Sequence, residues 1–116
     1  MLRQDTKDRY NIDMVLRNIV YSQKDLENFC QRWKIIRLEI FGSAIRDDFK
    51  EESDIDLLVE YHPDFHRTLV DMEVIQIEIE EIFQRPVNLI TRKTIESSQN
   101  PFKRQNVLAS AVVLYG

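Results

Sequence analysis

The sequence predicts a single domain in which helices cover a β-sheet, of the α/β or α+β class. Three strand-like segments, at residues 36–41, 54–61 and 86–91, are separated by segments with helical periodicity. The chain has 116 residues, which is enough for one hydrophobic core, and no repeat or linker divides it. We therefore expect one domain over residues 1–116, with an additional N-terminal helix within residues 1–21.

The composition favours a globular domain and argues against a membrane-spanning, secreted or bulk nucleic-acid-binding protein. Hydrophobic residues make up 43% of the chain and charged residues 31%, as in soluble globular domains. No apolar run approaches the roughly 20 residues of a membrane-spanning helix, and the polar N-terminus does not resemble a secretory signal. The single cysteine, Cys30, suits a reducing compartment, so we expect a cytoplasmic protein. The net charge of -4 argues against bulk nucleic-acid binding, although it permits a nucleotide whose phosphates are neutralised by divalent cations.

Two helices are predicted before the first strand. Residues 6–20 carry one apolar stripe at helical spacing, and Ser22 is a candidate N-cap for the next helix. The stripe of this second helix includes Cys30, which we expect to be a buried apolar thiol. The two stripes are Ile12, Val15, Leu16 and Ile19 in the first helix, and Leu26, Phe29, Cys30 and Trp33 in the second.

The first predicted strand, residues 36–41, alternates apolar residues with Arg37 and Glu39, so one of its faces is expected to be polar. A short helix is predicted from Ser43 to Arg46, followed by a charged loop over residues 47–52. The second strand, residues 54–61, follows that loop.

Residues 66–84 fit two patterns. Isoleucines at 75, 77 and 79 alternate with polar residues as in a strand, but a helical stripe extends over some 17 residues without Gly or Pro. The residues of this stripe, which we expect to face inward, are Leu69, Met72, Ile75, Ile79 and Ile82. Because a strand of that length is unusual, we predict a helix. A second apolar row, Val70, Val74 and Ile77, widens its hydrophobic face. We expect deep burial between layers, with an interface to a partner as the alternative.

The C-terminal region begins with a third strand at residues 86–91, with Pro86 at its first position. Asn100 and Pro101 have the residue types of an N-cap and first position of a last helix. Residues 112–115 either end that helix or add a short edge strand.

The residues best suited to ligand binding or catalysis lie at and shortly after Gly42, the only interior glycine of the sequence. A glycine permits a tight turn and close approach of the backbone to a ligand. Ser43 offers a hydroxyl and backbone N–H groups to an anion, and Arg46 could reach the same phosphates. Asp54 and Asp56 project from one face of a strand, which is unfavourable unless a cation such as Mg²⁺ lies between them. Together these residues predict a site for a metal-bound nucleoside triphosphate.

This arrangement of Gly42-Ser43, ten residues, and Asp54-Ile55-Asp56 resembles the minimal nucleotidyltransferases of the DNA polymerase beta-like superfamily, over roughly residues 23–115. The resemblance implies an α+β fold with a small mixed sheet flanked by helices. It also implies two Mg²⁺ ions and transfer of a nucleoside monophosphate to an acceptor hydroxyl. Many such proteins are similar to MntA-type antitoxins, which transfer AMP from ATP to a tyrosine of a HEPN-domain ribonuclease toxin and neutralise it.

One position departs from the family pattern. Asn88 stands where the family has a third Asp, and its parity in the strand points it towards the predicted site. Asn can ligate Mg²⁺ through its oxygen but cannot act as a base, which could cost on the order of 10²–10⁴ in rate. Glu60 is a weaker substitute, since it lies about 13 Å along the strand from Asp56.

Three functions therefore stay open: an adenylyl-transferring antitoxin, a catalytically impaired protein that neutralises its partner by complex formation, and a nucleotide-sensing regulator. Other chemical candidates are minor. His62 and His66 lack further ligands at zinc-site spacing. The basic residues Arg92, Lys93, Lys103 and Arg104 predict a solvated face or, alternatively, a surface that steers a triphosphate or an acidic partner.

Overall fold

The computed structural model describes residues 19–42 and 54–116. Most of the predicted first helix, residues 6–18, and the predicted helix and loop at 43–52 lie outside these ranges. Ile19 and Val20, at the end of the predicted first helix, are not helical. Ile19 is nevertheless fully buried in the core, whereas Val20 is exposed.

The sheet has four strands in the order β3-β2-β1-β4, and it is mixed. β1 pairs antiparallel with β2 and with β4, while β2 pairs parallel with β3. The strands are β1 (Ile35–Phe41), β2 (Ile55–Tyr61), β3 (Val87–Thr91) and β4 (Val112–Tyr115). This confirms the α+β class with a small mixed sheet, and it resolves residues 112–115 as an edge strand.

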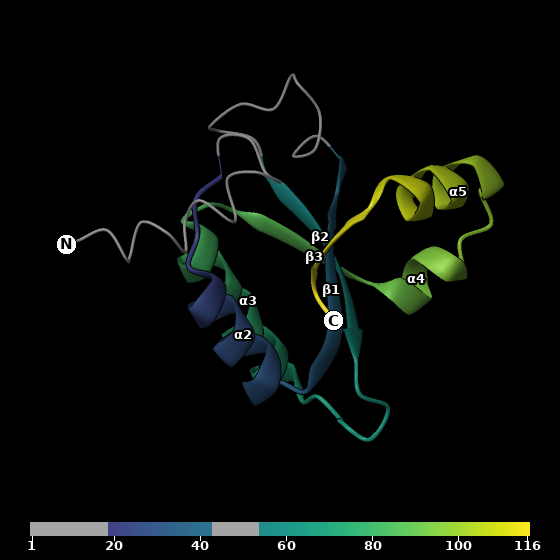
Figure 1. Ribbon diagram of the computed structural model, residues 1–116. Helices are drawn as coiled ribbons and strands as arrows, with labels where there is room; N and C mark the ends of the chain where they lie inside the picture. Colours follow the sequence, from purple (N-terminus) through teal and green to yellow (C-terminus); the bar gives the residue numbers. More distant parts are fainter. Residues whose placement is uncertain (1–18, 43–53) are drawn as a thin grey trace.

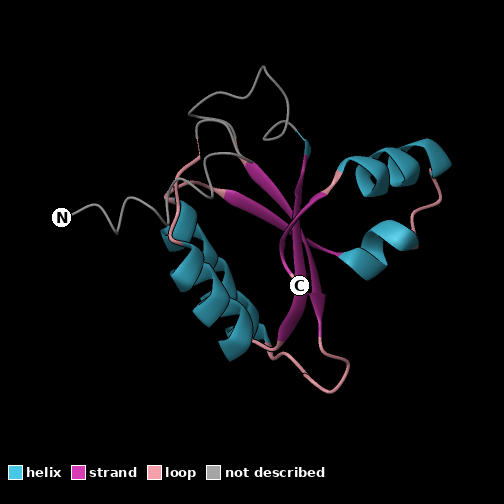
Figure 2. Cartoon of the chain, in the orientation of Figure 1, coloured by secondary structure: helices cyan, strands magenta, loops and turns pink. Residues whose placement is uncertain are grey.

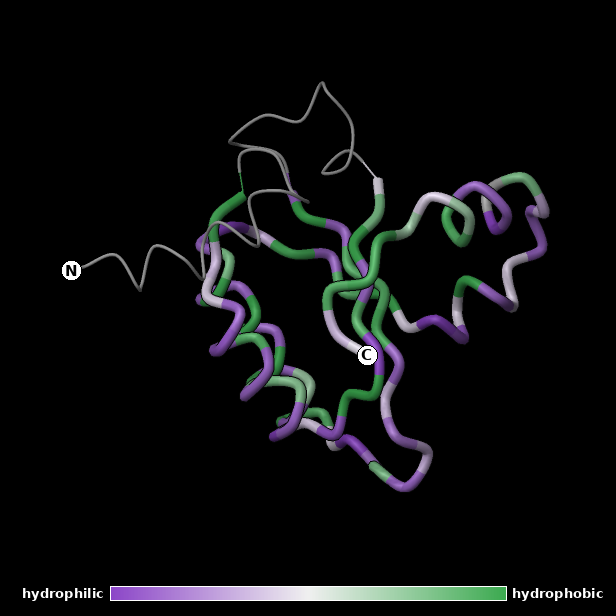
Figure 3. Tube along the Cα trace, in the orientation of Figure 1, coloured by the Kyte–Doolittle hydropathy of each residue, from purple (hydrophilic) through white to green (hydrophobic). Residues whose placement is uncertain are grey.

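Helices cover both faces of the sheet (Figures 1 and 2). α2 and α3 lie side by side on one face, and α4 and α5 lie on the other. Their bounds are α2 (Gln23–Arg32), α3 (Leu69–Phe83), α4 (Arg92–Glu96) and α5 (Pro101–Ser110). Figure 3 shows hydrophobic residues gathered along the central strands, whereas hydrophobic and hydrophilic residues alternate along α2 and α3.

Each face of the sheet has its own apolar cluster. The larger one joins α2 and α3 to the sheet through residues such as Phe29, Leu57 and Ile79. Cys30 is fully buried there, as predicted, and burial, together with the charge of Glu27, raises the pKa of its thiol to about 12. The smaller cluster consists of Phe41, Leu58 and Ile95, with partly buried α5 residues packed against it.

The prediction of a polar, solvent-facing side of the first strand is wrong at Glu39, because helices cover both faces of the sheet, whereas Arg37 is partly exposed. Glu39 is only 4% exposed, because α4 packs over the side that the alternation assigned to solvent. Ile36 deviates in the opposite direction: the alternation predicts that it faces the core, but it is 42% exposed. A register irregularity between Ile35 and Arg37 leaves Ile36 out of the β1–β2 ladder, and Ile35 is buried instead.

The helical interpretation of residues 66–84 is confirmed, with α3 beginning later than predicted. Thr68 and Asp71 form a reciprocal capping box that fixes its start at Leu69. The expected deep burial is wrong for part of the helix. Ile75 and Ile79 are buried, but the predicted inward positions Leu69 and Met72 and the second-row residues Val70 and Ile77 are exposed.

Other helix boundaries follow local signals. Ser22 caps α2, its Oγ accepting a hydrogen bond of 3.1 Å from the backbone of Asp25. The predicted cap of the last helix is present, since the Asn100 side chain accepts from the N–H of Phe102. The short α4 was not predicted; it begins after Thr91, whose hydroxyl accepts from the N–H of Thr94. None of the helices in the described ranges could span a bilayer.

Candidate functional site

Gly42 follows β1 and brings the backbone against Asp56. Its φ of +77° lies in the left-handed region, where side chains other than glycine are strained. A Cβ placed on Gly42 would lie 2.5 Å from Oδ2 of Asp56, which is closer than van der Waals contact allows. The backbone angle therefore favours glycine at this position, and any side chain here would have to displace the Asp56 carboxylate.

Asp56 lies on β2, between the neighbouring strands β1 and β3. In the ladder it is opposite Phe41 of β1 on one side and opposite Asn88 of β3 on the other. The Nδ2 group of Asn88 donates a hydrogen bond of 2.9 Å to Oδ1 of Asp56. Gly42, Asp56 and Asn88, which are far apart in sequence, thus meet at one end of the sheet, with Asn88 beside Asp56 as its parity predicted.

Asp54 comes immediately before β2, at this same end of the sheet. The predicted strand began at Asp54, but β2 begins at Ile55, whose N–H donates to the carbonyl of Pro86 at 3.0 Å. Asp54 is exposed. The predicted phosphate-binding residues Ser43 and Arg46 lie outside the described residues.

The oxygen atoms of this cluster are of the kind that Mg²⁺ binds. One oxygen of the Asp56 carboxylate faces Gly42 and the other accepts from Asn88, so the side chain is held in one position. Within the described part of the chain, no three residues of the types His, Cys, Asp and Glu gather as a metal site. The described carboxylates at this site are Asp54 and Asp56, while Asn88 supplies an amide.

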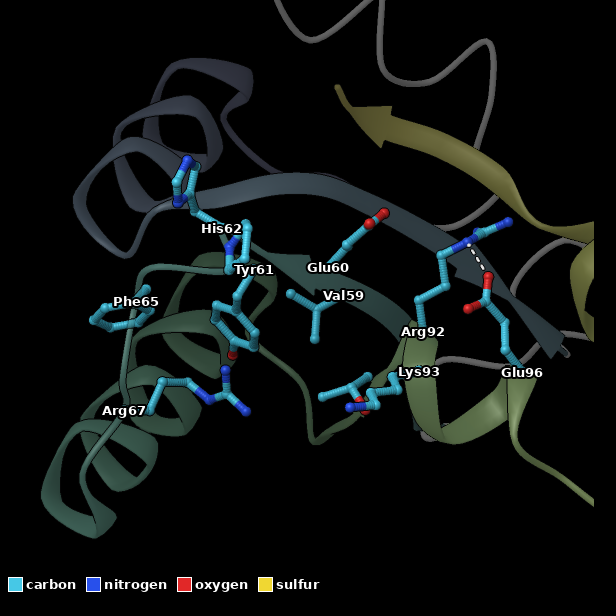
Figure 4. Close-up of a pocket in the computed structure, with 11 residues that line it drawn as sticks. Val59, Glu60, Tyr61, His62, Phe65, Arg67, Arg92, Lys93 and Glu96 are labelled. Carbon is cyan, nitrogen blue, oxygen red and sulfur yellow. Dashed lines mark hydrogen bonds and ion pairs between the residues drawn. The ribbon is translucent and has the colours of Figure 1, made fainter.

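A separate hollow of about 520 Å³ lies along the second half of β2 and the start of α4 (Figure 4). The Arg67 guanidinium lies over the Tyr61 ring at 4.0 Å, and Lys93 also lines this space. Glu60, the alternative third ligand, lines the hollow rather than joining Asn88. None of Gly42, Asp54, Asp56 and Asn88 lines this hollow. The candidate site is therefore defined by the pairing of β1, β2 and β3 at one end of the sheet, and not by this cavity.

The predicted basic surface is in part structural. Arg92 donates to Glu39 at 2.5 Å, which joins α4 to β1, and to Glu96 at 3.1 Å within α4. The second oxygen of Glu39 accepts from Arg37 at 3.3 Å, so the buried carboxylate is paired on both sides. Arg104 donates to the carbonyl of Ser98. The sequence did not predict the contact between Arg92 of α4 and Glu39 of β1, the strand that leads to Gly42. Local periodicity does not indicate which distant residues will pair.

Comparison with known proteins finds one matching family and several relatives. The family described as "Nucleotidyltransferase domain" matches residues 23–114. "Putative protein adenylyltransferase MJ0435" of Methanocaldococcus jannaschii is 36% identical over 76 residues, which is 66% of this chain and 75% of that protein. "Putative protein adenylyltransferase MJ1379" of the same organism is 35% identical over 80 residues, or 66% of this chain and 73% of that protein.

Solved structures share the fold. The chain described as "Structure of putative minimal nucleotidyltransferase" has a TM-score of 0.59 at 28% identity, covering 78% of this chain and 86% of that one. A chain from the "Crystal structure of the toxin-antitoxin with AMP-PNP" has a TM-score of 0.58 at 17% identity, covering 81% of this chain and 73% of that one. The matched residues 23–114 include Gly42, Asp54, Asp56 and Asn88, and the chain belongs to the nucleotidyltransferase domain family.

Proposed function

We propose that this protein is a Mg²⁺-dependent antitoxin that transfers AMP from ATP to a tyrosine hydroxyl of a HEPN ribonuclease toxin and thereby neutralises it. One observation carries the chemistry: the Asp56 carboxylate is held between the bare backbone of Gly42 and the amide of Asn88. A fixed carboxylate beside a glycine that lets a ligand approach is suited to a metal-bound phosphate.

The donor set fits magnesium. Asp54 and Asp56 would hold the metal, with two ions expected, and the Asn88 oxygen could join them if its amide turned over. Bound Mg²⁺ would supply positive charge that offsets the charge of the ATP phosphates. We assign phosphate contacts to the backbone at Gly42, to Ser43 and to Arg46.

In the proposed reaction, the acceptor oxygen forms a bond to the α-phosphorus of ATP, and the bond from that phosphorus to pyrophosphate breaks. The proton of the acceptor hydroxyl must leave. The amide of Asn88 cannot accept it, so we expect the proton to pass to water and the transfer to be slower, by on the order of 10²–10⁴, than with a general base in that place.

The proposed partner rests on the relatives. Those described as protein adenylyltransferases support a protein acceptor, and the structural neighbour described as a toxin-antitoxin with AMP-PNP supports a toxin partner and a nucleotide. We propose a cytoplasmic setting, in which a free thiol such as that of Cys30 stays reduced.

A second candidate function is neutralisation by complex formation without transfer. The Asn88 side chain favours it, because its N–H group, rather than a third carboxylate, faces Asp56. In that case the site would bind nucleotide and the inhibition would come from the protein–protein contact.

Intact mass spectrometry separates the two candidates. The HEPN ribonuclease proposed as the partner is incubated with this protein, ATP and Mg²⁺, and its intact mass is then measured. We expect a gain equal to one or more AMP groups, absent when Asp54→Ala or Asp56→Ala replaces the wild-type protein. No gain, together with neutralisation that persists in both variants, would refute the transferase and support the second function.

A further inference from the structure

α3 has an apolar row on its solvent side. Val70, Val74 and Ile77 follow one another at helical spacing, on the side away from Ile75 and Ile79, which are buried. Val70 is 68% exposed and Ile77 is 55% exposed, while Val74 between them is partly buried. Together with Leu69 at the start of the helix, which is 84% exposed, these three residues form what we call the α3 outer face. Contiguous exposed apolar residues of this kind mark interaction surfaces more often than isolated ones do.

The charged residues of α3 itself all have one sign, while Arg85, which follows the helix, lines a hollow together with Ile77 and Glu81. α3 contains five acidic residues and no Lys or Arg: Asp71, Glu73, Glu78, Glu80 and Glu81. Glu78 accepts from Arg32 and Trp33 at the junction with α2, and Glu80 accepts from the N–H of Val87. Glu73 and Glu81 lie one turn before and after Ile77 and are exposed. Within the described ranges, neither of these two carboxylates has a hydrogen bond or ion-pair partner.

We propose that the α3 outer face docks on an apolar groove rimmed by Lys and Arg, and that this groove is part of the RNA-binding surface of the ribonuclease partner. The identity of the partner rests on the proposed function. An enzyme that binds RNA needs basic residues for the phosphates, so it offers the charge that complements Glu73 and Glu81. A second copy of this chain would place acidic residues against acidic residues, which is unfavourable.

This docking gives the protein a second means of inhibition. An acidic helix on the RNA-binding surface excludes the RNA phosphates by position and by charge, without any covalent change to the toxin. Catalytically inactive variants at Asp56 are therefore expected to slow RNA cleavage while they remain bound, and added RNA is expected to compete with the complex.

The test is the affinity of the full-length chain for the purified ribonuclease, measured by isothermal titration calorimetry without ATP, at low and at raised salt. We expect Ile77→Lys to weaken binding about tenfold or more, as for an interface residue that contributes over 1 kcal/mol. The double variant Glu73→Lys, Glu81→Lys should bind similarly weakly and should lose most of the salt dependence. Phe102→Lys, at an apolar α5 residue that is 78% exposed, is the matched control and should stay within about twofold of wild type.

Several results would overturn the proposal. These are a ribonuclease that does not bind, α3 variants that bind like wild type, and an RNA oligonucleotide that fails to compete. A homodimer that Ile77→Lys dissociates would assign the face to a second copy. Cross-links within one chain, from Glu73 or Glu81 to residues 1–18, would assign it to the N-terminal segment. Circular dichroism must show that each variant is folded.

The same samples separate this proposal from the proposed function. A partner that gains no AMP, but whose complex is weakened by the α3 variants, refutes the transferase and supports the docking surface. A partner that gains AMP and binds the α3 variants with wild-type affinity supports the transferase and refutes the docking surface.

Discussion

Replacing Gly42 by alanine perturbs the candidate site at its tightest point. The backbone φ is +77°, and the new Cβ would lie 2.5 Å from Oδ2 of Asp56 and 3.4 Å from its Cγ. Because the carboxylate is the end of a short side chain, we expect it to rotate away rather than to push the strands apart. Rotation breaks the 2.9 Å hydrogen bond from Asn88.

The magnitude has two parts. A left-handed φ costs a residue other than glycine roughly 1–2 kcal/mol. Moving Asp56 out of its position adds about 1 kcal/mol, from an unfavourable rotamer and a hydrogen bond that is partly exposed to water. We therefore expect Gly42→Ala to lower the free energy of unfolding by about 2–3 kcal/mol. The protein remains folded, but its carboxylate no longer occupies the position in which it would hold Mg²⁺.

A double-mutant cycle in urea unfolding measures both parts. In the Asp56→Ala background the contact is gone, so Gly42→Ala should cost only the backbone strain, about 1–2 kcal/mol. A coupling of about 1 kcal/mol between the two positions is the expected result. The reasoning is refuted if Gly42→Ala is as stable as wild type, or if its cost is the same in both backgrounds.

Three further perturbations probe other parts of the structure. Asn88→Asp places a second carboxylate beside Asp56 and should make thermal stability depend on Mg²⁺, with a larger rise in melting temperature on adding Mg²⁺ than wild type shows. Glu39→Ala removes the buried partner of two arginines and should lower the free energy of unfolding by about 1–3 kcal/mol in urea. In alkaline solution the folded state keeps the protons of Cys30 and Tyr21, whose pKa values burial raises to about 12 from 9.0 and 10.0. The unfolded state loses these protons first, so stability should fall as pH rises from about 9 to 12, and in Cys30→Ala the fall should begin near pH 10.

Each of these has a contrary outcome. Equal Mg²⁺-induced shifts for Asn88→Asp and wild type would remove Asn88 from the metal site. An unchanged urea midpoint for Glu39→Ala would mean that the buried pair only offsets its own desolvation. A stability that is flat from pH 9 to 12 would contradict the burial of the Cys30 and Tyr21 side chains.

The sequence predicted most of the elements, because periodicity reports which positions face a core. It failed where a residue's surroundings come from distant parts of the chain. The alternation of β1 assigned Glu39 to solvent, since nothing local shows that α4 would cover that face and supply Arg92. In α3, Leu69 and Met72 fit the stripe, but the core contacts of this helix begin at Ile75.

The proximity of Gly42, Asp56 and Asn88 was easier to predict than the packing, whereas the predicted phosphate contacts of Ser43 and Arg46 lie outside the described residues. Gly42 and Asp56 are fixed by motif spacing, and the parity of Asn88 placed it on the correct side of its strand. What the sequence did not predict is the hydrogen bond from Asn88 to Asp56, because it depends on the parallel register of β2 and β3. The parallel direction of these two strands follows from the crossover through α3, but local sequence does not determine which residues of β2 and β3 pair.

The most direct test of nucleotidyl transfer at the Asp56–Asn88 site is the rate of pyrophosphate release from ATP in the presence of the ribonuclease partner. Wild type should release one pyrophosphate for each AMP that the partner gains, Asp56→Ala should release none above background, and Asn88→Asp should be faster than wild type. Absence of pyrophosphate from both wild type and Asn88→Asp would contradict transfer at this site.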